Sequence, residues 1–208
     1  MNKVEMRDIM GEIKYDKKFS IKTTGIKEWH HEVIHYNRCE PTPYHALDRL
    51  FKHYKLHKTD RLVDFGSGRG RVAFYIHNRF HIPVVGIEAQ DDVYDEAIKN
   101  KKRYRQRAKH IEAPIYFEYG LAENYEIEPM DNRFYFFNPF SAEVFKKVVD
   151  NILTSIEEVK REVDIILYYP MPKYKKILKN NTPFEFYNKV KIPNAKDKKE
   201  KFLIYRYT

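Results

Sequence analysis

A short segment of the chain, Asp64-Phe65-Gly66-Ser67-Gly68-Arg69-Gly70, combines one acidic residue with three alternating glycines. A strand pattern precedes it at 61–63 and a helical pattern follows it at 71–76. A glycine turn between a strand and a helix lets backbone N–H groups approach a ligand closely. A dinucleotide fingerprint would need a small residue at Arg71, and a phosphate loop would end in Gly-Lys-Ser/Thr. Neither condition is met, and the pattern that remains is Asp-x-Gly-x-Gly-x-Gly.

A second acidic residue stands where a ribose could be held. The apolar run at 83–87 ends in Glu88, which lies 18 residues beyond Gly70. A carboxylate at the end of the second strand of a βαβ unit can accept hydrogen bonds from both ribose hydroxyls. When shielded from water, each such bond contributes about 1.5–3 kcal/mol. The alternative interpretation is a glycine turn followed by a merely solvated glutamate.

Alternating strand and helix patterns surround these residues from residue 43 onward. Strands are expected at 61–65, 83–88, 114–119, 133–137 and 163–169, with helices at 69–80, 91–109, 141–160 and 173–180. Because the strands are almost continuously apolar, the pattern predicts a doubly wound α/β fold whose mostly parallel sheet is covered on both faces. Two further strands, at 184–192 and 201–207, predict a closing antiparallel hairpin.

The region before the first strand is less regular. Thr42-Pro43 predicts the N-cap and first turn of a helix. Residues 1–25 are polar and only weakly periodic, so this region is expected to be partly mobile.

The Asp-x-Gly-x-Gly-x-Gly segment, together with Glu88, resembles motif I and the ribose-binding acid of the class I S-adenosylmethionine (SAM) methyltransferases. The resemblance covers residues 43–208 and implies a seven-stranded sheet whose last strand is antiparallel to its neighbours. It implies S-adenosyl-L-methionine as the cofactor. Residues 1–42 are then expected to form an N-terminal extension, part of it lid-like.

The resemblance also implies which residues contact the cofactor. The turn would cradle the methionine part through Gly66, Ser67, Gly68 and Gly70, and Asp64 would orient the amino group of that part. Glu88 would hold the ribose, and Ala89 and Gln90 would lie against the adenine.

The exit of the third strand departs from the family pattern. Many members carry Gly-Asp-Ala there, whereas this chain reads Gly120-Leu121-Ala122-Glu123. The side chain of Leu121 cannot accept a hydrogen bond from the adenine amino group. The expected adenine contacts are therefore the backbone of Leu121 and Ala122, or the side chain of Glu123.

The fourth strand ends in Asn138-Pro139-Phe140, which resembles the Asn-Pro-Pro-Tyr/Phe motif of amino-group methyltransferases, shortened by one proline. In that family the asparagine oxygen and a proline carbonyl accept hydrogen bonds from the target amine, and the aromatic ring stacks on the target. The resemblance implies catalytic roles for Asn138, Pro139 and Phe140. The alternative is a strand-ending turn that only shapes the pocket wall.

Polar and aromatic residues are concentrated at 36–44, Tyr-Asn-Arg-Cys-Glu-Pro-Thr-Pro-Tyr. With the glycine turn and Asn138-Pro139-Phe140, this segment resembles a bacterial branch of class I methyltransferases that is distantly similar to the non-SET histone-lysine methyltransferases. The resemblance implies a segment folded over the cofactor, with Glu40, Thr42 or Tyr44 in contact with cofactor or substrate. A plain helix-capping loop is the alternative.

The charge of the chain leaves its partners open. The net charge is +9, and basic residues concentrate at 99–109 and 196–199. The first run shares a helix with an apolar face, so a solvated surface is favoured over phosphate binding, although nucleic acid remains a candidate partner.

Other residue types narrow the setting. Cys39 is the single cysteine, which excludes an internal disulfide and favours a cytoplasmic protein. No apolar run is long enough for a membrane span. His30, His31 and His35 lack the partners of a metal site, so no metal is expected. Candidates for a general base rest on position alone; they are Tyr168, Tyr169 and Glu40.

These observations predict methyl transfer from SAM, to nitrogen rather than to oxygen or carbon. A small molecule, a protein side chain and RNA remain alternative acceptors, and the oligomeric state is left open. The competing hypothesis is a non-catalytic module that keeps the fold but binds nucleic acid or a partner protein. Retention of Asp64, the glycines and Glu88 argues against it, since a pocket without a ligand does not need that set.

Overall fold

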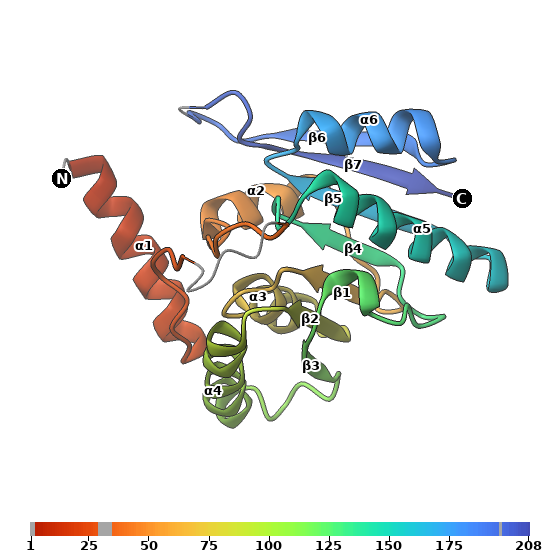
Figure 1. The fold of residues 1–208 in the computed structure, drawn as a ribbon. Coiled ribbons are helices and arrows are strands. Elements are labelled where there is room, and N and C mark those ends of the chain that lie inside the picture. Colours follow the sequence, from red (N-terminus) through yellow and green to blue (C-terminus); the bar gives the residue numbers. More distant parts are fainter. Residues whose placement is uncertain (1–2, 29–34, 196) are drawn as a thin grey trace.

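One seven-stranded sheet organises the chain, with the strand order β3-β2-β1-β4-β5-β7-β6 (Figure 1). The computed structural model describes residues 3–28, 35–195 and 197–208, with side chains from residue 10 onward. The strands are β1 (Leu62–Phe65), β2 (Val84–Glu88), β3 (Ile115–Tyr119), β4 (Arg133–Phe136), β5 (Val163–Tyr168), β6 (Glu185–Lys191) and β7 (Lys201–Tyr207). Strands β1 to β5 pair in parallel, and β7 is antiparallel to both β5 and β6. The predicted fold class is confirmed.

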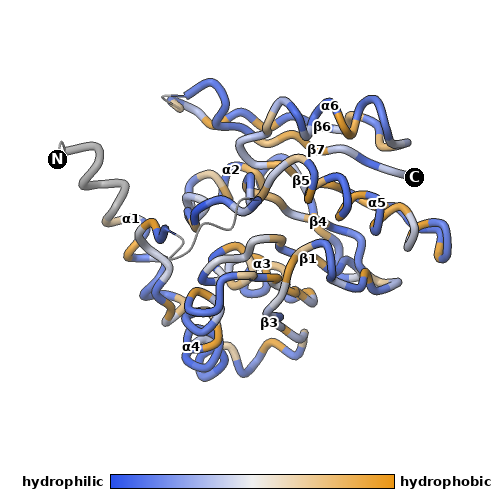
Figure 2. Tube along the Cα trace, viewed as in Figure 1, coloured by the Kyte–Doolittle hydropathy of each residue, from blue (hydrophilic) through white to orange (hydrophobic). Residues whose placement is uncertain are grey.

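Helices cover both faces of the sheet. They are α1 (Lys3–Phe19), α2 (Tyr44–His53), α3 (Arg71–Phe80), α4 (Asp91–Arg107), α5 (Ala142–Glu158) and α6 (Pro172–Asn181), with a short 3-10 helix at Ala122–Asn124. Apolar side chains of α1 to α4 form one core cluster with the sheet, and those of α5 and α6 form a second. Figure 2 shows apolar residues along the central strands, in contrast to the largely hydrophilic α4. Two buried faces explain why the central strands are almost continuously apolar.

Helix α5 illustrates how the sequence pattern becomes packing. Ser141 caps the helix, its hydroxyl accepting a hydrogen bond from the backbone N–H of Val144. The predicted apolar stripe is buried, with each side chain at most 2% exposed: Val144, Phe145, Val148, Val149, Ile152 and Ile156. Full burial of such side chains stabilises the fold by about 1.5–3 kcal/mol each.

The N-terminal region is more ordered than its sequence pattern predicts, because residues 3–19 form the 17-residue helix α1. Polar contacts hold much of it in place. Asp16, only 5% exposed, accepts hydrogen bonds from the hydroxyls of Tyr44 and Thr23. The Tyr15 hydroxyl donates to Asp48 of α2. Because α1 is held largely by hydrogen bonds, its sequence lacks the periodic apolar stripe from which a helix is predicted.

Two further predictions need correction. Pro43, not Thr42, occupies the N-cap position of α2, and the Thr42 hydroxyl is hydrogen-bonded to Tyr135 instead. The basic run of α4 is only partly solvated, since Arg103 donates to the carbonyl of Ser20 and Arg107 to that of Lys17. These arginines fasten α4 to the end of α1.

The described part of the chain contains no helix with the length and apolarity of a membrane span. Among the same residues, no three His, Cys, Asp or Glu side chains are grouped so that they could hold a metal ion. His30 and His31 lie outside the described residues.

The strand order reverses between the central strands β1 and β4. From β1 the chain continues to β2 and β3 on one side, and from β4 it continues to β5 on the other. Asp64 of β1 lies opposite Tyr135 of β4 and Gly86 of β2. In doubly wound sheets, ligands bind beyond the carboxyl ends of the strands at such a reversal. The glycine turn leaves β1 at this point.

Candidate active site

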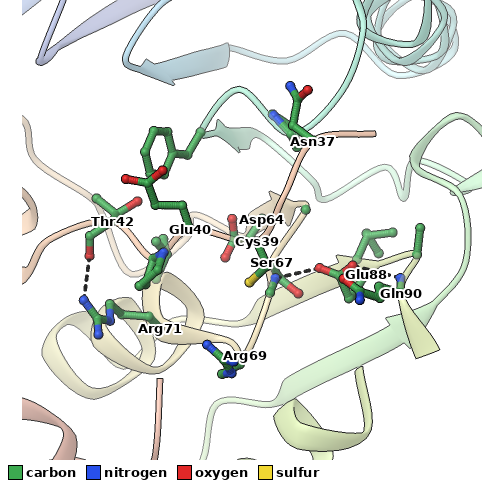
Figure 3. Close-up of a pocket in the computed structure, with 18 of the residues that line it drawn as sticks. Asn37, Cys39, Glu40, Thr42, Asp64, Ser67, Arg69, Arg71, Glu88 and Gln90 are labelled. Carbon is green, nitrogen blue, oxygen red and sulfur yellow. Dashed lines mark hydrogen bonds between the residues drawn. The ribbon is translucent and has the colours of Figure 1, made fainter. Parts of the chain in front are cut away.

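A pocket opens beyond the carboxyl ends of β1, β2 and β4 (Figure 3). Three segments provide most of its lining: the glycine turn at 66–69, the end of β2 at 87–90, and residues 36–42. Its empty volume is about 750 Å³, including open solvent at the mouth.

The glycine turn can be built only with glycine at two of its positions. Gly66 and Gly68 have positive φ angles of 71° and 56°. A Cβ at Gly66 would lie 2.4 Å from Cβ of Pro139, and one at Gly68 would lie 2.7 Å from Sγ of Cys39. The turn is therefore in close contact with both the loop that follows β4 and the 36–42 segment.

The third glycine has a different role. Gly70 precedes α3 with a φ of 87°, and a Cβ there would lie 2.5 Å from the ring of Phe117. Gly70 is not among the residues that line the pocket. It allows α3 to pack closely on the sheet.

Glu88 joins the turn to the end of β2. Its two carboxylate oxygens accept hydrogen bonds from the backbone N–H groups of Gly68 (2.8 Å) and Gln90 (2.9 Å). The side chain is 6% exposed, and this burial raises its pKa although the N–H groups oppose the shift. Each oxygen has a further lone pair to offer to a ligand hydroxyl.

Asp64 lines the pocket and is only 2% exposed, and its Oδ2 atom has no hydrogen-bond partner. Burial, helped by the nearby charge of Glu88, raises the pKa of Asp64 to about 8. A cation placed against this carboxyl would favour its ionised form. The environment of Asp64 therefore suits an ammonium group.

Arg71 is a pocket residue to which the sequence analysis assigned no role. Its guanidinium is held by Thr23 Oγ1 (2.7 Å), by the carboxylate of Glu12 and by the carbonyl of Thr42, and it lies 4.4 Å from the ring centre of Tyr44. The residue is 3% exposed. Its Nη2 atom has no partner although it is buried in the pocket lining.

Four side chains of this lining carry a buried polar atom without a hydrogen-bond partner: Asp64 Oδ2, Ser67 Oγ, Arg71 Nη2 and Gln90 Oε1. An unsatisfied buried group costs about 1–3 kcal/mol, and such groups are scarce in folded proteins. An amino acid zwitterion joined to a nucleoside would offer each of them a partner. SAM has that composition, so the residues present fit this cofactor.

Residues 36–42 form a segment, here called the strap, that is fastened on both sides of the pocket. Cys39 exchanges backbone hydrogen bonds with Lys27. On the other side, the Tyr36 hydroxyl donates to Glu123 and accepts from the backbone N–H of Ala122. The strap residues Glu40 and Thr42 line the pocket, whereas Tyr44 is buried in the core.

The remaining predicted cofactor residues divide into two groups. Ala89, Gln90 and Ala122 line the pocket. Leu121 lies outside it and is 41% exposed, while Gly120 joins the lining. The carboxylate of Glu123 is engaged by Tyr36.

The three residues Asn138, Pro139 and Phe140 lie in different environments. Pro139 lines the pocket, and its carbonyl accepts a hydrogen bond from the backbone N–H of Asn37 (2.9 Å). Asn138 adopts a positive φ of 44°, and its buried Oδ1 atom has no hydrogen-bond partner. Phe140 is 1% exposed and packs in the core beside Phe136, whereas the neighbouring Phe137 lines the pocket.

Of the residues considered as a base, only Glu40 lines the pocket. The hydroxyls of Tyr168 and Tyr169 donate to Glu200 and Asp197, and both tyrosines have a raised pKa. Burial and the charge of Glu88 raise the pKa of the Cys39 thiol to about 11, which keeps it protonated at neutral pH.

A family model described as histone methylation protein DOT1 matches residues 39–118, which contain the second half of the strap, the glycine turn and Glu88. No curated protein matches the chain. The matched part includes β1 and β2, whose carboxyl ends carry the glycine turn and Glu88.

Solved structures share the fold of nearly the whole chain. A methyltransferase from Pyrococcus furiosus is 13% identical with a TM-score of 0.61, covering 99% of this chain and 98% of that one. An RNA methyltransferase from Salinibacter ruber, in complex with S-adenosyl-L-homocysteine, is 21% identical with a TM-score of 0.55 and coverages of 81% and 92%. Aeropyrum pernix fibrillarin with bound SAM is 16% identical with a TM-score of 0.53 and coverages of 78% and 73%.

The chain thus has the class I methyltransferase fold. Fold and family-model match agree on one kind of enzyme, the SAM-dependent methyltransferases.

Proposed function

We propose that this methyltransferase binds SAM in the pocket beneath the strap and transfers its methyl group to a nitrogen atom of the acceptor. The observation that carries the cofactor assignment is the set of four unpartnered polar atoms in one pocket lining. Two of them belong to Asp64 and Arg71, which carry opposite charges once Asp64 is ionised and then match the ammonium and the carboxylate of an amino acid.

Each residue of the lining then has a distinct binding role. Arg71 holds the carboxylate through Nη2, and Asp64 holds the ammonium through Oδ2. Glu88 accepts from the ribose hydroxyls while keeping its hydrogen bonds from the backbone N–H groups of Gly68 and Gln90. The free oxygen of Gln90 accepts from the adenine amino group, which compensates for the apolar Leu121.

Bound SAM supplies a methyl group on a positively charged sulfur, open to in-line attack by a lone pair. The chain contributes alignment, which can supply a large part of the acceleration. We assign the acceptor contacts to Asn138 Oδ1, which has no protein partner, and to the ring of Phe137 in the pocket lining. Glu40, at the strap, is positioned to take the proton released by the amine.

The cofactor assignment is tested by calorimetric titration of the full chain with SAM. Wild-type protein is expected to bind, and Asp64→Ala is expected to lose binding because the ammonium has no anion to pair with. Asp150→Ala provides a matched control, since Asp150 is exposed on α5 and its ion pair is with the exposed Lys146. Equal affinity of wild type and Asp64→Ala would refute the assignment.

The nitrogen assignment is tested with Asn138→Ala. We expect the rate of methyl transfer to fall roughly a hundredfold, since the acceptor is no longer aligned. SAM affinity should stay unchanged, and Asn180→Ala on the exposed side of α6 serves as the control. Full transfer activity in Asn138→Ala would contradict the role given to this side chain.

A further inference from the structure

Four lysines gather at one end of the C-terminal hairpin: Lys175 of α6, Lys189 and Lys191 of β6, and Lys201 of β7. We call them the lysine cluster. Lys191 and Lys201 lie directly opposite each other on neighbouring strands. Burial and the positive charges of the other three lower the pKa of Lys201. The four side chains therefore share one local field.

Protein charges do not balance this cluster. None of the four lysines forms an ion pair with any residue in the described ranges. The carboxylate of Asp197 opposes this pKa shift of Lys201, but it already accepts hydrogen bonds from the Tyr169 hydroxyl and the backbone N–H of Lys199. Like charges directly opposite on paired strands destabilise a sheet. An anionic ligand would remove that cost.

Protection of an exposed sheet edge is the simpler explanation for some of these residues. Lysines on edge strands discourage pairing with other chains, and β6 is an edge strand. This explains Lys189 and Lys191. It does not explain Lys201, on the inner strand β7, or Lys175, on a helix.

An exposed aromatic ring lies on the same face of β6 as two of the lysines. Phe186 pairs with Tyr205, and Lys191 pairs with Lys201. Residues three apart normally point to opposite faces, but a bulge between 186 and 188 brings Phe186 and Lys189 onto one face. Phe186 is 59% exposed. One face of the edge strand thus presents a ring followed by two cations.

Basic groups continue on the other side of the same strand. A groove between α2 and β6 is lined by Arg49 and His53 as well as by residues 188–191. Arg49 Nε donates to the carbonyl of Lys191, which fixes this guanidinium beside the strand. Positive charge therefore surrounds the carboxyl half of β6.

The position of the cluster relates it to the pocket. Strand β6 runs parallel to β1–β5, so Lys191 and the start of β7 lie at the sheet edge that also carries the glycine turn (Figure 1). The backbone N–H of Tyr169, at the end of β5, donates to the carbonyl of Lys201. A polymer bound along β6 would be directed across the ends of β5 and β4 toward Pro139.

We infer that the lysine cluster and Phe186 bind single-stranded RNA, and that RNA is the methyl acceptor. This rests on the proposed function and names its acceptor class. The lysines contact phosphates, while Phe186 stacks on an unpaired base, the combination used by proteins that bind single strands. Unpaired bases are what most RNA-binding proteins recognise, and their exposed edges carry nitrogen nucleophiles.

The test measures binding of a fluorescein-labelled single-stranded RNA by anisotropy, with the full chain and without SAM. The logarithm of affinity is plotted against the logarithm of salt concentration. Each phosphate contact contributes about 0.7 to the slope for a single strand. The variant K189Q/K191Q is expected to lower the slope by about 1.4, with an affinity loss of at least about tenfold at low salt.

The control K99Q/K102Q removes the same charge from exposed positions of α4. Its slope should match that of the wild type. If both double variants lower the slope equally, or if K189Q/K191Q leaves it unchanged, the assignment of the cluster is overturned. Equal binding of poly-glutamate would likewise overturn RNA in favour of an acidic protein.

Phe186→Ala separates stacking from charge. We expect an affinity loss of roughly five- to a hundredfold for the single strand with the salt slope unchanged, and a smaller loss for the duplex of the same sequence. Equal losses for the single strand and the duplex would contradict the stacking role. SAM titration of each variant reports on the cofactor pocket separately, so failure of the RNA proposal and failure of the proposed function remain distinguishable.

Discussion

The two ends of the sheet differ in how far their charged side chains are buried. Around β1 and β2, charged side chains are buried, individually placed and few, as with Asp64 and Arg71 at 2% and 3% exposure. Around β6 and β7, the four lysines of the cluster are more accessible and form no ion pair with the described residues, whereas Arg206 of β7 pairs with Asp164 and Glu162. The first arrangement suits a ligand of one fixed shape, and the second suits a polyanion whose shape varies.

The difference has a physical basis. A buried charge must meet a definite partner, because the energetic cost of leaving it unpaired is high. A surface lysine stays hydrated, and each contact with a phosphate adds only a small binding free energy. The affinity then depends on the number of lysine–phosphate contacts rather than on their exact geometry. The pocket would make the protein selective for its cofactor, and the hairpin would provide affinity for the acceptor.

The largest effect is expected for Arg71→Met, which removes the guanidinium from the buried side of this comparison. Glu12, Thr23 and the Thr42 carbonyl lose their shared donor, and Glu12 becomes a carboxylate without its cation. We expect the free energy of unfolding to fall by about 3–5 kcal/mol, measured by urea denaturation. Arg79→Met, in the same helix but with an exposed ion pair to Asp48, should cost less than about 1 kcal/mol.

If the two arginine variants are equally stable, Arg71 is not the buried anchor that its contacts indicate. In that case α1 would be attached to the pocket mainly through Asp16 and Tyr15.

Glu88→Ala should weaken SAM binding by roughly one to two orders of magnitude. Two shielded hydrogen bonds to the ribose are lost, and the turn loses its link to β2. Calorimetry provides the measurement. Glu118→Ala is the matched control, because Glu118 is exposed on the neighbouring strand β3. An affinity unchanged from wild type would exclude Glu88 as the ribose ligand.

The pH dependence of SAM binding should follow Asp64. Its pKa of about 8 lies above the ordinary value of 3.8, so the carboxyl is protonated at pH 6 and ionises as the pH rises. Only the ionised form pairs with an ammonium, so affinity should rise by up to about tenfold per pH unit below 8. Near pH 8 the amino group of the ligand begins to lose its own proton, which limits the rise.

The same shift has the opposite consequence for the cofactor-free fold. The protonated form is favoured in the folded state, so this contribution to stability is lost as the pH rises from about 3.8 toward about 8. Asp64→Asn should reduce both dependences. A SAM affinity in wild type that stays flat between pH 6 and 8 would show that Asp64 does not meet the ammonium.

The smallest expected effect concerns salt. Buried pairs are little screened, so SAM affinity should change by less than about twofold between roughly 50 and 200 mM salt. RNA affinity should fall steeply over the same range. A comparable salt dependence of both would remove the distinction drawn between the two halves of the molecule.

Sequence reasoning recovered the sheet because its signals are local. The apolar strands, the glycine turn and the acid at the end of β2 lie within a few residues of the features they predict. The positions of Gly66, Gly68 and Glu88 follow from that local order.

What the sequence did not reveal depends on contacts between distant parts of the chain. Arg71 enters the pocket because Glu12 and Thr23 hold it, and those residues are 59 and 48 positions away. Whether Phe137 or Phe140 lines the pocket depends on which of the two rings packs in the core. Phe140 packs against Phe136, and no local pattern reports that.

The most direct test of the account combines cofactor and acceptor in one assay. Methyl-labelled SAM is incubated with the full chain and a cell lysate, in parallel with Asp64→Ala and Asp150→Ala. The account predicts acid-precipitable label that nuclease releases, present with wild type and Asp150→Ala and absent with Asp64→Ala. Binding of SAM by the wild type without transfer of label to any fraction would contradict it and favour a non-catalytic module.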